Sequence, residues 1–229
     1  MSIVSERKRS LSGRKLQLRA RAARQAETRA RIVAATVALH EELGPLQTTI
    51  TAIAARAGVE RLTVYRHFAD EESLHRACTQ HFFSEHPPPD PASWTATDFA
   101  QRVRLGLVEL YRYWESIQAM ASSLLRDHEI DPERAGAGIV NFTARARDAL
   151  LPDPATHSAN EIVLNAAIGH AVHFYAWRSL VRDQKLTTPQ AVALMTSLIT
   201  TVANQPLAPD GWFGELGSAA SRPSSPGHA

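Results

Sequence analysis

Residues 49–68 hold polar and aromatic side chains whose types and spacing suit the reading of DNA. The segment TITAIAARAGVERLTVYRHF predicts a helix from Ile50 to Ala57, a turn at Gly58 and a second helix from Arg61 to Phe68. Thr49 is a good N-cap, and glycine readily adopts the positive φ that ends a helix. The second of two helices joined by so tight a turn can enter the DNA major groove, which admits an α-helix.

The second helix is expected to bury one side and expose the other. Val64 and Phe68 lie four residues apart and mark the buried side. The exposed positions combine cations, hydroxyl groups and aromatic rings, which can contact phosphate oxygens and base edges. The predicted DNA-binding residues are Thr49, Arg61, Leu62, Thr63, Tyr65, Arg66 and His67. Helix, glycine and helix alone would fit an ordinary helical hairpin equally well.

The residue pattern decides between these interpretations, because it resembles the DNA-binding motif of TetR-type (tetracycline-repressor family) regulators. That family carries a stretch of the form T-T-V-x-x-I-A-x-x-A-G-V-S-x-G-T-L-Y-x-H-F. The matching residues here are Thr48-Thr49-Ile50, Ile53-Ala54, Ala57-Gly58-Val59, Thr63-Val64-Tyr65 and His67-Phe68. The resemblance covers roughly residues 28 to 78.

The resemblance implies a role for each matching position. Phosphate contacts are expected from Thr49, Tyr65 and His67, and contacts with base edges from Arg61, Leu62 and Thr63. The sequence departs from the family pattern at three places. Glu60 stands where a Ser or Thr cap is usual, Leu62 where a small residue is usual, and Glu71 where a Lys is usual.

The N-terminus is strongly basic. Residues 1–31 hold ten Lys and Arg but only two Glu, whereas residues 32–229 hold 15 bases and 21 acids. A charge block of this kind is either a solvated tail or an arm for a polyanion. Beside a helix-turn-helix we favour a DNA-binding arm over residues 1–27, partly helical from Arg14 onwards.

The rest of the chain predicts an all-α protein with two domains. Residues 28–86 form the helix-turn-helix domain, the proline-rich residues 86–91 form a stiff break, and residues 92–204 form a helical bundle for ligand binding and dimerisation. Residues 205–229, rich in Pro, Gly, Ser and Ala, are expected to be disordered. The expected helices span residues 28–43, 50–57, 61–68, 70–85, 97–114, 116–127, 131–151, 158–183 and 188–203.

The last two predicted helices carry more apolar surface than one bundle needs. Ser158 and Glu161 form a capping box for a helix that reaches Asp183, and its apolar residues cover more than one stripe. One side can face the core and the other a second copy of the chain, which is also what the resemblance implies. We therefore expect a homodimer through residues 158–204, with burial in the monomer core as the alternative.

Cysteine content and the lack of long apolar stretches indicate the cellular compartment. Cys78 is the only cysteine, which excludes an internal disulfide and fits a reducing environment. No stretch of 18 apolar residues predicts a membrane span, and the basic N-terminus lacks the apolar region of a secretion signal. These features favour a cytoplasmic protein.

Catalytic and metal-binding motifs are not evident. The sequence has no phosphate-binding loop, no Gly-x-Ser-x-Gly and no His-Glu-x-x-His. His75, Cys78 and His81 lie at i, i+3 and i+6, too widely spread around one helix to ligate one ion without help. We therefore predict no enzyme activity, no metal and no cofactor.

The predicted small-molecule site lies in the C-terminal domain. Bundle pockets are mostly apolar and contain a few polar groups that orient the ligand. The candidate ligand-binding residues are Tyr111, Trp114, His170, His173, Phe174 and Trp177. Large aromatics with two histidines suggest a mainly apolar ligand, aromatic or acyl-like, held by one or two hydrogen bonds. Any of the six can equally be a core residue.

Together these features predict a dimeric, sequence-specific DNA-binding transcriptional regulator. Following the resemblance, we expect a repressor that a small, mainly apolar ligand releases from a double-stranded operator. The alternative is a ligand-binding helical protein or enzyme in which the DNA-binding domain has lost its role. The operator sequence and the ligand's identity are not encoded in any motif.

Overall fold

The protein is all-α in a computed structural model that describes residues 3–152 and 161–204, with side chains from residue 15 onwards. Its contacts divide it into two compact units. The first holds Met1–Asp90 and Leu110–Phe142, and the second holds Pro91–Glu109 and Thr143–Ala229. The predicted break after residue 86 lies beside one division. The grouping of residues 110–142 with the N-terminal helices has no counterpart in the predicted domains. The predicted tail, residues 205–229, lies outside the described residues.

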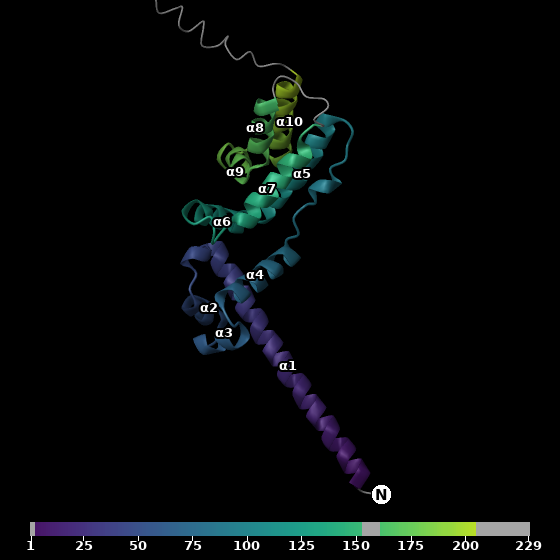
Figure 1. The fold of residues 1–229 in the computed structure, drawn as a ribbon, viewed down its shortest axis with the longest axis vertical. Helices are drawn as coiled ribbons and strands as arrows, with labels where there is room; N and C mark the ends of the chain where they lie inside the picture. The colour runs from purple at the N-terminus through teal and green to yellow at the C-terminus, as the bar shows by residue number, and fades with distance from the viewer. Residues whose placement is uncertain (1–2, 153–160, 205–229) are drawn as a thin grey trace, which may run out of the picture. The chain divides into compact units, whose positions relative to one another are not determined.

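The first helix, α1 (Ile3–Glu42), contains the predicted arm. We expected a helix start at Thr28, and this was wrong because the helix is continuous through that residue. Residues 14–43 contain neither Pro nor Gly and are rich in Ala, Arg and Leu, which are good helix formers. Residues 15–27 are exposed, and burial begins at Ile32. Figure 1 shows this N-terminal part of α1 extending beyond α2–α4.

Three shorter helices follow α1. They are α2 (Ile50–Ala57), α3 (Arg61–His67) and α4 (Glu71–Glu85), and the 3-10 turn η1 (Pro45–Gln47) precedes them. Two of them, α2 and α4, pack against α1, and α3 packs against α2. Asp70 begins α4 with a capping box, in which its side chain accepts the Ser73 N–H, close to the predicted helix start at residue 70. The shared core is apolar and includes Ile32, Leu39, Ile53, Val64, Phe68 and Leu74.

Helix α5 (Phe99–Ser116) begins in the second unit and ends in the first, and α6 (Gln118–Ile130) belongs to the first unit. The next helix, α7 (Ala137–Leu150), starts six residues later than the predicted start at Asp131. The segment forms only one turn, in which Arg134 N–H and Ala135 N–H bond to Asp131 O. Gly136 then takes φ 75°, and that left-handed conformation separates this turn from α7.

A buried carboxylate joins α6 to the turn between α1 and α2. Asp127 is 1% exposed, and its Oδ2 accepts the Leu46 N–H at 2.9 Å. Beside it, Arg126 donates to Leu43 O at 2.6 Å and bonds to Asp127 Oδ1. The helix-turn-helix is therefore held to α6 by polar contacts as well as by packing.

The second unit contains the 3-10 turn η2 (Pro91–Ser93), α8 (Glu161–Val172), α9 (Phe174–Arg178), the π-helical turn η4 (Ser179–Asp183) and α10 (Thr188–Asn204). The single helix predicted from Ser158 to Asp183 was wrong, because the chain breaks at His173, which has ψ 139°. Its Nδ1 accepts the Tyr175 N–H at 3.3 Å and so caps α9. The predicted cap at Ser158 lies outside the described residues.

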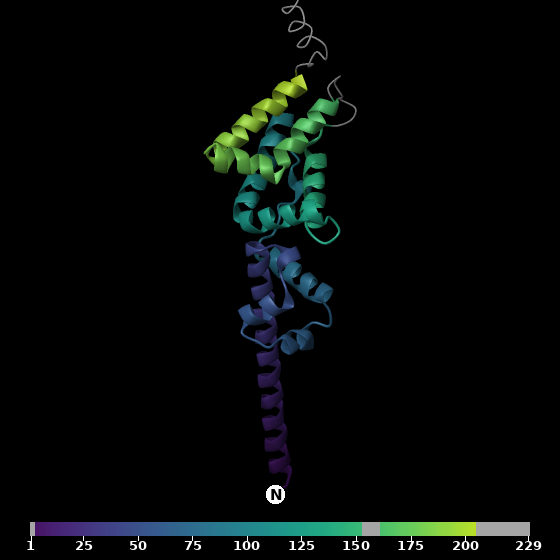
Figure 2. The same cartoon turned by 90° about the vertical axis from the view of Figure 1, so that its left-hand side faces the viewer.

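Helices α8 and α10 pack against each other (Figure 2), and the contact buries Leu164, Ile168 and Ile199 among others. Both helices also expose apolar side chains, most of all Ile162 at 86% and Leu198 at 51%. Within the residues described, no helix combines the length and the apolar character needed to cross a membrane.

Candidate DNA-binding surface and ligand pocket

The turn between α2 and α3 has the geometry that its sequence predicted. Thr49 caps α2, since its hydroxyl oxygen accepts the Ala52 N–H at 3.1 Å. Gly58 ends α2 at φ 65°, ψ 41°, and the Val59 N–H bonds back to Ala54 O at 3.0 Å. Glu60 occupies the N-cap of α3 without a side-chain hydrogen bond, which leaves that helix start less well capped.

Helix α3 is anchored by one side and open on the other. Val64 is 1% exposed, Phe68 is 3% exposed, and the guanidinium of Arg29 lies 4.7 Å from the Phe68 ring centre. Of the predicted DNA-binding residues on α3, the following are exposed: Arg61, Leu62, Tyr65 and Arg66. Thr63 and His67 are half-buried. The structure therefore groups these six on one short helix whose outer face is accessible.

Two contacts that fix α2 and α3 were not predicted. Arg56 of α2 makes two hydrogen bonds to the Glu42 carboxylate of α1, at 2.8 and 2.7 Å. The other is the stacking of Arg29 on Phe68. Each joins residues 14 or more positions apart, so helical periodicity gives no signal for it.

Residues 32–78 match the model of a family described as bacterial regulatory proteins, tetR family. The matched segment begins at the first buried residue of α1, includes α2 and α3, and ends halfway along α4. The chain is a DNA-binding transcriptional regulator of the tetR family.

Among solved structures, the regulator is similar to a protein described as a transcriptional regulator of Streptomyces coelicolor A3(2). The two are 25% identical, the match covers 78% of this chain and 99% of that chain, and the TM-score is 0.48. A tetR-family transcriptional regulator from Streptomyces coelicolor gives 19% identity, coverage of 85% and 96%, and a TM-score of 0.45. No curated protein matches the regulator. The family assignment therefore rests on residues 32–78.

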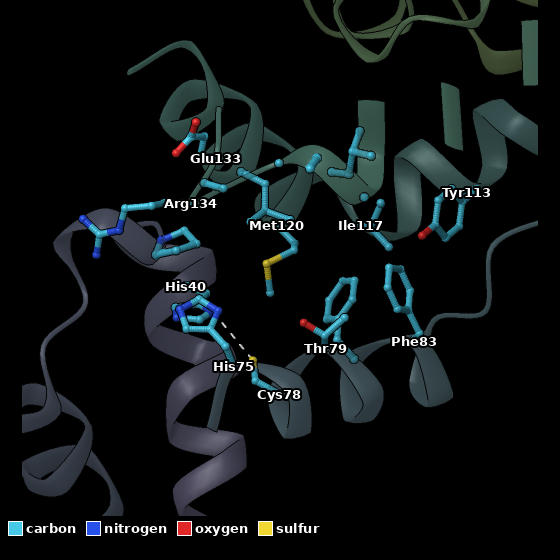
Figure 3. Close-up of a pocket in the computed structure, with 18 residues that line it drawn as sticks. His40, His75, Cys78, Thr79, Phe83, Tyr113, Ile117, Met120, Glu133 and Arg134 are labelled. Atoms are coloured by element: carbon cyan, nitrogen blue, oxygen red, sulfur yellow. Dashed lines mark hydrogen bonds between the residues drawn. The ribbon is translucent and has the colours of Figure 1, made fainter. Parts of the chain in front are cut away.

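The first unit of the regulator also encloses a cavity of about 240 Å³, and all its lining residues belong to that unit. Helices α1, α4, α5, α6 and α7 and the turn before α7 contribute to its wall (Figure 3). Most of the wall is apolar. Its large apolar side chains are Phe82, Phe83, Ile117, Met120, Leu124 and Ile139. A mainly apolar wall with a few polar groups is the usual composition of a small-molecule site.

One end of the cavity carries two stacked histidines. The ring centres of His40 and His75 are 4.8 Å apart, and Cys78 Sγ lies 3.6 Å from His40 Nδ1. Burial lowers the pKa of His40 to about 4, and burial also lowers the pKa of His75. Burial raises the pKa of the Cys78 thiol to about 12. This end is therefore uncharged near neutral pH although it is rich in polar atoms.

The opposite end carries the Tyr113 hydroxyl. Figure 3 shows Tyr113 on the side of the cavity opposite the histidines, with its hydroxyl turned towards the cavity. The residue is 7% exposed, and its hydroxyl, which makes no hydrogen bond with a described residue, keeps some surface open to the cavity. Burial raises the Tyr113 pKa to about 12, so the group stays protonated. Glu133 and Arg134, of opposite charge, form an exposed part of the rim.

None of the six predicted ligand-binding residues lines this cavity. Tyr111 and Trp114 belong to the first unit and are fully buried, with the Trp114 ring packed edge-on against Phe142. In the second unit, Phe174 and Trp177 pack together with ring centres 5.4 Å apart. His170 is exposed, and His173 caps α9. The assignment of a ligand to these six residues stays a prediction.

The sequence analysis considers His75 and Cys78 only as metal ligands along one helix and does not predict their contact with His40 of α1. Within the residues that the structure describes, no group of His, Cys, Asp or Glu has the geometry for a metal ion. His40, a buried polar residue in the apolar stripe of α1, is the sequence feature that could have indicated this cavity.

Proposed function

We propose that the regulator is a homodimeric repressor that leaves its operator when a small, mainly apolar molecule binds. The main support is the outer face of α3, where Arg61, Leu62 and Tyr65 are exposed while Val64 holds the helix in the core. A helix anchored in this way can enter the major groove without losing its packing. Since operators lie in the bacterial cytoplasm, the proposal puts the protein there.

Base reading is assigned to Arg61, Leu62 and Thr63, and phosphate binding to Thr49, Tyr65 and His67. Arginine can donate two hydrogen bonds to guanine, and hydroxyl groups bind phosphate without reading sequence. Arg66 is exposed at the C-terminal end of α3 and adds a further cation beside the backbone. The basic arm of α1 adds affinity that does not depend on sequence.

Dimerisation is assigned to the exposed apolar faces of α8 and α10. Ile162, Val163, Leu194 and Leu198 are each at least 39% exposed. Apolar side chains clustered on neighbouring helices favour burial against another surface, and a second copy is the simplest partner. Two copies would present two recognition helices to half-sites about one helical turn, or a multiple of it, apart.

A footprint on the DNA upstream of the regulator's own coding sequence tests this function. We expect two protected half-sites and a stronger affinity for this fragment than for random DNA of equal length. Leu198→Arg should abolish dimerisation in sedimentation and weaken the footprint, because an unpaired buried charge is costly. Equal affinity for both DNAs would refute sequence-specific repression, and a dimeric Leu198→Arg protein would remove α10 from the interface.

A further inference from the structure

We propose that the cavity of the first unit binds a small uncharged molecule with an apolar body and one hydroxyl-type group that hydrogen-bonds to Tyr113. A phenol or other cyclic alcohol has this chemistry. The inference rests on the proposed function for its regulatory consequence, since the occupant would be the effector. The binding site itself is argued from the cavity alone.

The Tyr113 hydroxyl is the first reason to expect a ligand rather than a packing defect. Tyr113 is 7% exposed, and its hydroxyl is not among the buried atoms that lack a partner, so it keeps surface open to the cavity and available to a ligand. This hydroxyl is turned into the cavity and makes no hydrogen bond with any described residue. A ligand hydroxyl or carbonyl group in the cavity would satisfy it.

The size and wall of the cavity restrict the body of the ligand. Its volume of about 240 Å³ would hold about eight water molecules at roughly 30 Å³ each. That is slightly below the range of about 300–1,000 Å³ for drug-sized ligands, so a molecule of one or two rings fits best. Phe82 and Phe83 on α4 and Met120 on α6 offer aromatic and thioether surface for such rings.

The electrostatics of the cavity favour an uncharged ligand. His40 and His75 have lowered pKa values and are neutral at pH 7, and the Cys78 thiol stays protonated. At the rim, the exposed Glu133 and Arg134 offset each other in charge. An ion would therefore lose its hydration without gaining a buried partner of opposite charge. His75 makes no hydrogen bond with a described residue, so it offers a second polar contact at the far end.

Two helices that line the cavity, α4 and α6, also hold the helix-turn-helix in place. Helix α4 packs through Leu74 into the helix-turn-helix core, and residues between His75 and Phe83 of the same helix line the cavity. Helix α6 lines the cavity with Met120 and Leu124, and it holds the turn between α1 and α2 through Asp127. A ligand in the cavity would thus contact two elements that also fix α2 and α3.

The turn before α7 fits closely over α6 beside this cavity. A Cβ at Gly136 would lie 2.6 Å from His128 Cβ and 2.8 Å from Leu124 O, so only glycine fits there. His128 Nδ1 lies 2.8 Å from Ala135 O and ties the turn to α6. A shift of α6 on ligand binding would therefore move this part of the wall as well.

Calorimetric titration of the full chain with three naphthalene compounds tests the site. We expect 1-naphthol to bind, naphthalene to bind about three- to tenfold more weakly for lack of one hydrogen bond, and 1-naphthoate to bind more weakly still. Tyr113→Phe should reduce 1-naphthol affinity to that of naphthalene and leave naphthalene affinity unchanged. The control His81→Gln, on the exposed side of α4, should leave both affinities unchanged.

Several results would overturn the proposal. They are the absence of 1-naphthol binding, tighter binding of 1-naphthoate, equal affinities for 1-naphthol and naphthalene, and insensitivity of 1-naphthol binding to Tyr113→Phe. If His173→Gln were the only variant that lost 1-naphthol binding, the binding site would lie in the second unit instead.

Operator affinity measured with and without 1-naphthol separates the site from the proposed function. We expect 1-naphthol to lower the affinity for operator DNA in the range of its own binding, because linkage is reciprocal. Binding of 1-naphthol without this effect would overturn its role as an effector. Binding of 1-naphthol as described by a protein that recognises no operator would refute the repressor and leave the ligand site standing.

Discussion

The outer face of α3 and the cavity bounded by α1, α4 and α6 lie in the same unit of the regulator but differ in how the sequence specifies them. The face consists of residues between Arg61 and His67 on one short helix, where all but the buried Val64 are exposed or half-buried. The cavity gathers residues up to 99 positions apart, from His40 to Ile139, and some of its polar groups belong to largely buried residues such as Tyr113. One surface is specified by local sequence and the other by packing.

The difference predicts how each region responds to mutation. A substitution on the exposed face changes what the protein binds but removes few contacts within the fold, so its stability should change little. A substitution of a buried polar group leaves its partners unsatisfied and should destabilise the fold. The following predictions are arranged by their expected effect on the free energy of unfolding.

The largest effect is expected from Asp127→Ala. The change removes the acceptor of the Leu46 N–H and a partner of Arg126 at a side chain that is 1% exposed. We expect a loss of about 3 kcal/mol, as found when one partner of a buried polar contact is removed. Urea denaturation measures it.

The matched control for this variant is Asp148→Ala. Asp148 also pairs with the arginine that precedes it, Arg147, at 2.7 Å, but its side chain is 59% exposed. An exposed pair of this type contributes little, so the loss should stay below about 0.5 kcal/mol. Equal losses in the two variants would show that burial of Asp127 has no special importance.

A smaller, pH-dependent effect is expected from His40→Phe. The His40 pKa is about 4 in the folded protein against 6.5 for a free side chain. Between these values the unfolded chain binds a proton that the folded chain does not, so acidification favours unfolding. This contribution is negligible above pH 6.5 and amounts to about 2 kcal/mol at pH 5.

In His40→Phe this part of the acid sensitivity should vanish, because phenylalanine keeps a ring beside His75 but cannot bind a proton. Unfolding free energies at pH 7 and pH 5 give the comparison, and His81→Phe, on the exposed side of α4, is the control. If His40→Phe loses as much stability on acidification as the unsubstituted protein, His40 is not the group that the fold keeps neutral.

A modest gain is expected from Glu60→Ser at the start of α3. Glu60 occupies the N-cap without a side-chain hydrogen bond. Serine can accept a backbone N–H of the first turn, which stabilises a helix by roughly 0.5–1 kcal/mol. Thermal unfolding should show a small rise in Tm, and an unchanged or lower Tm would mean that Glu60 already satisfies this helix start by other contacts.

The smallest effect on stability, with a clear effect on binding, is expected from Arg61→Ala. Its stability should stay within about 0.5 kcal/mol of the parent, since Arg61 is exposed. Its binding to the operator should weaken by about 1–3 kcal/mol if Arg61 donates to a guanine. Titration of operator and random DNA separates the two roles, because an equal loss for both would assign Arg61 to phosphate.

The sequence by itself determined the local structure of the DNA-binding region. Thr49, Gly58 and Asp70 specify helix ends through contacts with residues at most four positions away, so their effect can be predicted without a tertiary structure. The buried side of α3, at Val64 and Phe68, follows from helical periodicity in the same way. The resemblance to TetR-type regulators also rests on Thr49, Gly58, Val64 and Phe68.

Only the tertiary structure decided where a helix stops without such a signal and which distant residues meet. Periodicity predicted one helix through His173, but there the chain takes an extended conformation and begins α9. It also gave no reason to bring His40 beside His75 and Cys78 or to turn Tyr113 towards the same space. Contacts between residues far apart in sequence depend on how helices pack, and the one-dimensional pattern of a single helix does not encode them.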